Sequence, residues 1–197
     1  MNDKIKTAIE IAMERAAMLE DLSEEEKESI ENKKKLNPIM TGFYRNEIGP
    51  EKLWTKLKNE RASLLKQAQL NLLESLKFSL EPEEIKRRNK GIIAIESLKK
   101  DQKTSAIQQG LSLLENMQKK AETEKKQVFN EFKKAVENNP QARTRVVEQG
   151  GAKIVLKLSV EDAIAQNQQW KQFLSDFEKN YNSEFDKVCD QVKKYIS

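Results

Sequence analysis

The chain has 197 residues, a formal net charge of +4, and an unusual balance of 35% charged against 6% aromatic residues. It contains no histidine and a single cysteine, which excludes catalysis by a histidine base, zinc sites built on histidine, and an intramolecular disulfide. Only 6 glycines and 4 prolines interrupt a chain rich in Glu, Lys, Leu, Ala and Gln, a composition typical of long helices.

The first residues, from Met1 to Lys6, lack the apolar run of a signal peptide. No apolar stretch approaches the ~20 residues that a membrane-spanning helix needs. No phosphate-binding loop, calcium loop or metal-ligand motif is present, so we expect no cofactor. We therefore expect a cytoplasmic protein with no membrane partner.

Two helices are predicted at the start of the chain, over residues 3–22 and 24–36. The first carries a narrow apolar stripe that includes Ile5, Ala12 and Leu19. The second begins at a capping box formed by Ser23 and Glu26, and we expect the Asn37-Pro38 pair to end it. Residues 37–50 then read as a loop.

The next predicted helix covers residues 50–79, opening at Pro50 and presenting a wide leucine-rich face. A longer helix is predicted over 82–138. Its apolar residues recur every seven positions, which is the period of a coiled-coil seam, at Ile107, Leu114, Ala121, Val128 and Ala135. Gly110 and Glu124 interrupt the companion row. A break near Thr104, dividing this stretch into two helices, remains an alternative.

Residues 143–158 are the one region without a helical pattern. β-branched residues flank Gly150-Gly151, which favours a β-hairpin. A short helix that ends at a glycine cap, followed by an extended link, is the alternative. A last helix is predicted over 160–196, starting at a capping box of Ser159 and Asp162.

The expected fold is therefore all-α: one domain over 1–197, an elongated antiparallel bundle of long helices with coiled-coil-like seams and a small irregular or β-hairpin insert near 143–158. Seams of this kind often continue onto another subunit. We expect a homodimer, or a complex with another protein.

Two segments are candidates for partner binding. The first is Phe43-Tyr44-Arg45 between two glycines, because loop aromatics beside arginine are enriched at binding hot spots. Its structural alternative is a loop that Phe43 pins to the bundle. The second is a basic face that a hairpin would build on alternate residues, available to an anionic partner, from Arg143, Arg145, Lys153 and Lys157. Its alternative is a connector whose charges protect a strand edge.

Three other features have a structural interpretation that outweighs a functional one. Glu83 and Glu84 precede the basic cluster 86–90 at a spacing that favours ion pairs along a solvated helix face. Cys189 has no histidine to activate it. An aromatic row at helical spacing is typical of core packing, and it consists of Trp170, Phe173, Phe177, Tyr181 and Phe185.

These observations favour a non-enzymatic scaffold or adaptor that binds another protein. One alternative is a nucleic-acid-binding protein that uses the cluster 86–90 and the face around Arg143 and Lys157. Another is an enzyme that works with carboxylates and a divalent metal, for which no paired carboxylates are visible.

The opening stretch Ile5 to Arg15 resembles the start of an uncharacterised bacterial family of about this length. The arrangement near the end of the chain is similar too, with a glycine link, the run Ile154 to Leu158, the segment Gln169 to Phe173, and a terminal helix. The family has no assigned activity, so the resemblance implies an all-helical protein and assigns no site.

Overall fold

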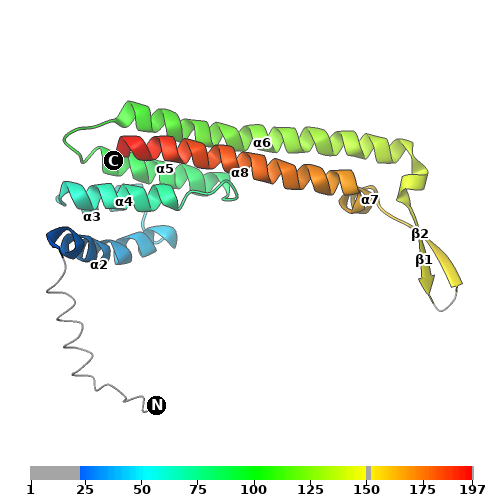
Figure 1. The fold of residues 1–197 in the computed structure, drawn as a ribbon, viewed down its shortest axis with the longest axis horizontal. Helices are drawn as coiled ribbons and strands as arrows, with labels where there is room; N and C mark the ends of the chain where they lie inside the picture. Colours follow the sequence, from blue (N-terminus) through cyan, green and yellow to red (C-terminus); the bar gives the residue numbers. More distant parts are fainter. Residues whose placement is uncertain (1–22, 150–151, 197) are drawn as a thin grey trace, which may run out of the picture.

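The computed structural model of the chain describes residues 23–149 and 152–196. Figure 1 shows an elongated molecule with a wide end and a narrow end. At the wide end, which we call the body, shorter helices pack beside one half of a long antiparallel helix pair. The other half of that pair extends away as an arm and finishes in a two-stranded hairpin, the tip.

The expected class is confirmed: the described chain is helical apart from one small antiparallel sheet. The predicted helix 3–22 lies outside the described residues. The elements, in chain order, are α2 (Glu24–Tyr44), α3 (Pro50–Leu57), α4 (Ala62–Glu74), α5 (Pro82–Glu96), α6 (Thr104–Asn138), a 3₁₀ turn η1 (Pro140–Arg143), β1 (Thr144–Gln149), β2 (Ala152–Lys157), α7 (Val160–Gln166) and α8 (Gln168–Ile196).

The predicted helix starts are confirmed where a local signal defines them. Ser23 and Glu26 form the capping box of α2, with the Ser23 N–H donating to Glu26 Oε2 at 2.9 Å and the Glu26 N–H donating to Ser23 Oγ at 3.3 Å. The hydroxyl of Ser159 accepts the Asp162 N–H at 3.0 Å at the start of α7. Pro50 and Pro82 stand in the first turns of α3 and α5.

The predicted end of α2 is wrong. The helix runs through Pro38 to Tyr44, so most of the expected loop 37–50 is helical. A proline inside a helix costs roughly 3 kcal/mol. The stripe of Leu36, Met40 and Phe43 offsets this cost, because all three side chains are buried in the body core and keep their helical spacing only if the helix continues.

The predicted helix 50–79 is two helices, separated by residues 58–61. These four residues, Lys-Asn-Glu-Arg, offer nothing apolar to the core. Arg61 instead pairs with α2, through Glu31 at 2.6 Å and Glu28 at 3.5 Å. The stretch 82–138 is also divided, as the alternative with a break near Thr104 anticipated.

Glu96 fixes the reversal between α5 and α6. Its carboxylate is 1% exposed and accepts the backbone N–H of Lys103 at 2.6 Å across the turn. The predicted last helix is divided as well, at Asn167, whose side-chain oxygen accepts the N–H groups of Gln169 and Trp170 at 2.8 and 3.2 Å. Asn167 acts as a cap that the sequence pattern did not reveal.

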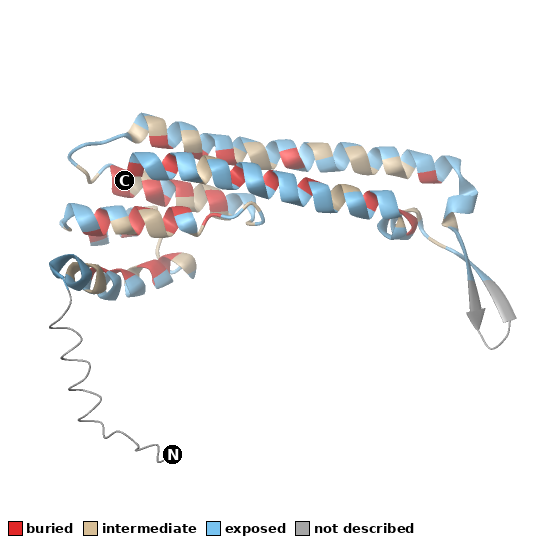
Figure 2. Ribbon diagram, viewed as in Figure 1, coloured by how far each residue is buried: buried red, intermediate tan, exposed pale blue. Residues whose placement is uncertain are grey.

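The core thins from body to tip, as Figure 2 shows. The large body cluster receives Ile107 and Leu114 from α6, and Phe185 and Val192 from α8. Two smaller clusters follow along the arm, one around Ala121 and the other around Val136, Ile164 and Trp170. No helix in the described part of the chain is long and apolar enough to cross a membrane.

Candidate functional site

The arm ends in a β-hairpin, which confirms that alternative for residues 143–158. β1 and β2 pair antiparallel from Thr144–Lys157 to Gln149–Ala152, with Val146 opposite Val155. Two glycines, Gly150 and Gly151, connect the strands. The last strand pair, Gln149–Ala152, leaves these two residues between the strands, as the sequence pattern of a β-hairpin predicts.

The hydrogen-bond pattern shows which backbone groups the hairpin uses. The Leu158 N–H donates to the Arg143 carbonyl at 2.8 Å, so these two residues form a bonded pair next to the first strand pair, Thr144–Lys157. Bonded and non-bonded pairs alternate in an antiparallel ladder, so Thr144–Lys157, Val146–Val155 and Glu148–Lys153 are the non-bonded pairs. The N–H and C=O groups of these residues point outward, toward the two free edges of the sheet.

Apolar side chains at the tip are left uncovered. Val146 is 57% exposed, Val155 is 65% exposed and Leu156 is 46% exposed. Within the described residues, β1 and β2 form a two-stranded sheet with no third strand. A hairpin of this kind is marginal in water unless it packs on something.

Arginines hold the base of the hairpin to the arm. Arg143 donates through Nε to the Leu158 carbonyl at 3.0 Å, and Arg145 donates through Nη1 to the Gln166 side chain at 3.0 Å. Arg145 therefore ties β1 to the end of α7.

The predicted basic face is wrong. The register places odd-numbered residues of β1 opposite even-numbered residues of β2, so Arg143 and Arg145 share one face while Lys157 lies opposite Thr144, on the other. Lys153 pairs in register with Glu148, and its side chain lies outside the described part of the structure. The strand register is the reason, because residues directly opposite each other share a face and every pair joins an odd-numbered to an even-numbered residue.

The second predicted site lies on the end of α2. Phe43 is fully buried, Tyr44 is half-buried with its hydroxyl donating to the Asn71 carbonyl at 3.0 Å, and Arg45 is exposed. The pKa of Tyr44 is raised, and burial is the largest of the several influences on it. These contacts fit the structural alternative, in which Phe43 fastens this segment to the body.

The basic cluster 86–90 meets this same segment. Arg87 stands 4.4 Å from the centre of the Phe43 ring, donates to the Phe43 carbonyl, and pairs with Glu84 at 2.8 Å. Arg88 stands 5.4 Å from the centre of the Tyr44 ring. The two sequence candidates are thus two sides of one structural joint between α2 and α5, which no local pattern in the sequence indicated.

The aromatic row on α8 is core, as its structural interpretation predicted. Trp170, Phe177, Tyr181 and Phe185 are all buried. The Tyr181 hydroxyl donates to Glu124 Oε2 at 2.7 Å. Burial and the Glu124 carboxylate together raise the pKa of Tyr181 to about 12.

Cys189 is half-buried against the body core. Burial, with the carboxylates of Asp186 and Asp190, raises the pKa of its thiol to about 11. The thiol is therefore protonated at neutral pH, which is unfavourable for a nucleophile.

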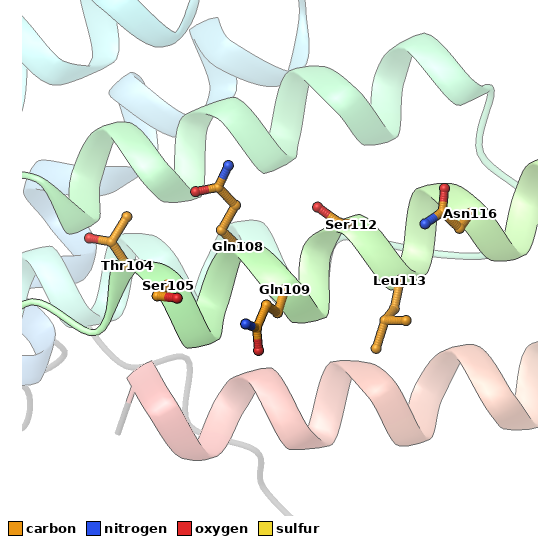
Figure 3. Close-up of a pocket in the computed structure, with 7 residues that line it drawn as sticks. All are labelled: Thr104, Ser105, Gln108, Gln109, Ser112, Leu113 and Asn116. Carbon is orange, nitrogen blue, oxygen red and sulfur yellow. The ribbon is translucent and has the colours of Figure 1, made fainter.

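A surface hollow of about 800 Å³ lies along α6 (Figure 3). Every residue that lines it belongs to this one helix, so it is a surface strip rather than a binding cavity. The strip carries no charge and consists of Thr104, Ser105, Gln108, Gln109, Ser112, Leu113 and Asn116. Among the described residues, no group of three or more Asp, Glu, Cys or His is placed to hold a metal ion.

Comparison with known proteins gives one match. Residues 50–194 fit the model of a family of unknown function, DUF6657. The matched region contains the body helices from α3 onward, the arm and the tip, whereas the opening stretch Ile5 to Arg15 lies before it. No curated protein and no solved structure matches the chain. Because the match covers well over half of the chain, the protein belongs to this family of unknown function.

Proposed function

We propose that the protein is a non-enzymatic helical scaffold whose tip binds another polypeptide by strand addition. One observation carries the proposal: the arm holds a hairpin with open edges and exposed valines away from the body. Open strand edges offer unpaired N–H and C=O groups, and an added strand satisfies them. Exposed apolar side chains beside such an edge supply the contact area that stabilises the added strand.

The helix packing supports the scaffold part of the proposal. The arm is two antiparallel helices, α6 and α8, stabilised by aromatic contacts that include Phe129 and Phe132 against Trp170 at 5.6 and 5.5 Å between ring centres. Such aromatic pairs stabilise the packing of the two helices beyond the contribution of their buried area. The body anchors the arm at its other end with a much larger core.

A photo-crosslinking side chain introduced at position 144, which is exposed on β1, tests the proposal in the native cell. We expect a covalent adduct with a polypeptide that mass spectrometry then identifies. The same crosslinker at Lys179, which is exposed on α8, is the matched control and should give no adduct of that mass. Val146→Lys should abolish the adduct at 144, because a lysine on the β1 edge discourages pairing. An absence of adducts at 144 would contradict the proposal.

A further inference from the structure

The two outer edges of the tip hairpin differ in the residues that they carry. Three residues on each strand direct their backbone groups outward, as the alternation of the ladder requires. They are Thr144, Val146 and Glu148 on β1, and Lys153, Val155 and Lys157 on β2. One edge therefore has a lysine on both sides of its central valine, and the other has none.

Lysines at an edge strand are a common protection against pairing with another chain. A strand added beside β2 would run alongside Lys153 and Lys157, the register positions on either side of Val155. A strand added beside β1 would run alongside Thr144, Val146 and Glu148, and alongside Arg145, whose side chain donates to Gln166 at 3.0 Å. The open edge of the tip is thus the outer edge of β1.

We propose that β1 pairs antiparallel with β1 of a second copy of this chain, which joins two hairpins into one four-stranded sheet of order β2-β1-β1-β2. The inference rests on the proposed function and names the polypeptide that the tip binds. The pairing is centred on Val146, so that Val146 of one copy lies opposite Val146 of the other. This register forms one continuous valine row across all four strands, because Val155 already lies opposite Val146.

Backbone groups fit this register. Neither the N–H nor the C=O of Val146 bonds to β2, so the two copies of Val146 can exchange a pair of hydrogen bonds across the axis. The Thr144 N–H is taken by the Gln141 carbonyl within η1, but the Thr144 carbonyl is directed outward and accepts the Glu148 N–H of the second copy.

The charged residues are also compatible with this β1–β1 register. Thr144 lies opposite Glu148 of the second copy and Arg145 lies opposite Val147, so no residue faces a like charge. The same symmetric pairing through β2, centred on Val155, would place Lys153 opposite Lys157 twice. Cross-strand pairs of like charge are destabilising.

The arrangement also closes at two copies. Both outer edges of the four-stranded sheet are then β2, and each has its lysines. A head-to-tail pairing of β1 with β2 would leave an open edge at every step and build filaments. In Figure 1 the hairpin projects beyond the ends of α6 and α8, so the body does not stand in the path of a second tip.

Two proline variants form a matched test by sedimentation velocity. Val146→Pro removes an outward N–H from the β1 edge, and Val155→Pro removes the equivalent N–H from the β2 edge. Neither removes a bond within the hairpin, because both residues belong to a non-bonded pair. We expect the wild-type chain and Val155→Pro to sediment as dimers, and Val146→Pro as a monomer.

Val146→Lys provides an independent check that does not introduce proline, and it should also be monomeric. Amide exchange supplies a second readout: the Val146 N–H should be protected in the wild-type chain and the Val155 N–H should not. A monomeric wild-type chain would overturn the inference, and so would a dimer that survives both changes at Val146 or is lost equally in both proline variants. A monomer whose position 144 crosslinks to a different protein would overturn the second copy as partner and leave the proposed function standing.

Discussion

At the scale of single residues, Glu96 is a buried charge whose carboxylate has three partners. Its carboxylate accepts hydrogen bonds from the Lys103 N–H at 2.6 Å and from Gln69 Nε2 at 2.9 Å, and it pairs with Lys99 at 3.2 Å. Burial by itself raises the pKa of Glu96, but these three partners outweigh it, so the pKa is lowered below the usual 4.5. Three segments, α4, α5 and the turn before α6, meet at this side chain.

Glu96→Gln should lower the free energy of unfolding at neutral pH by about 1.5–3 kcal/mol, the range for hydrogen bonds to a charged group. Because the folded-state pKa is lowered, the stabilisation is present above the unfolded value and is lost as pH falls through the folded value. Wild-type stability should therefore fall below about pH 4.5, and the variant should show less of this fall. Urea unfolding at several pH values measures both effects. Glu51→Gln, at an exposed carboxylate, is the control; an equal acid dependence in wild type and Glu96→Gln would contradict the assignment.

At the scale of the elements, two residues of α6 that break the seam pattern both lie against α8. Glu124 accepts the Tyr181 hydroxyl. At Gly110, α6 lies close against α8: a Cβ there would stand 2.3 Å from Cγ2 of Val192, a fully buried side chain. The sequence pattern registered both as interruptions because it counts only apolar residues.

Gly110→Ala should destabilise the protein by about 1–3 kcal/mol, since the added methyl group overpacks the contact with a stiff β-branched side chain. In an exposed helix position the same change stabilises by roughly 0.5–1 kcal/mol. Thermal unfolding of the variant measures the difference. Adding Val192→Ala should recover part of the loss by making room, and Ser112→Ala on the exposed side of α6 is the control. A stabilised Gly110→Ala would show that the helices are not in close contact there.

The seam itself shifts by one residue along the arm. Ile107, Leu114 and Ala121 are buried as the heptad predicts, but near the tip Val136 is buried and Ala135 is exposed. A straight helix turns by 3.6 residues and drifts about 20° per heptad from a strict repeat of seven. Over the four heptads from Ile107, this drift carries Ala135 off the contact face and brings Val136 onto it.

At the scale of the whole molecule, stability is distributed unevenly between body and arm. The body combines residues from α2 to α6 and α8 in one large cluster, whereas the arm is a two-helix layer with two small clusters. Local unfolding free energy follows the number of buried apolar contacts.

Hydrogen exchange followed by mass spectrometry should therefore show the slowest amides in α4 and α5. Amides of α6 beyond Ala121 should exchange faster, although they belong to the same continuous helix as Ile107. The comparison within α6 is internally controlled, because both halves share one helix and differ in what covers them. Uniform protection along α6 would contradict the division into body and arm.

A structural feature could be predicted from the sequence when the interaction that forms it is short in range. The helix caps were predicted correctly because each cap is a hydrogen bond over three residues, as at Ser23 with Glu26 and Ser159 with Asp162. The continuation of α2 through Pro38 could not be predicted, because it depends on segments far along the chain that bury Met40 and Phe43. The contact of Arg87 with Phe43 was hidden for the same reason, because the two residues are far apart in the sequence. This contact directs one arginine of the basic cluster 86–90 toward the body.

The sequence by itself determined the helical class, the helix starts, the absence of histidine chemistry and the two competing forms of the region around Gly150-Gly151. These depend on composition and on contacts within a few residues. Only the tertiary structure decided where helices end, which arginines are engaged, and that the hairpin stands uncovered with one lysine-flanked edge and one open edge. Burial and strand register are joint properties of distant segments, and they exist only once those segments are placed together.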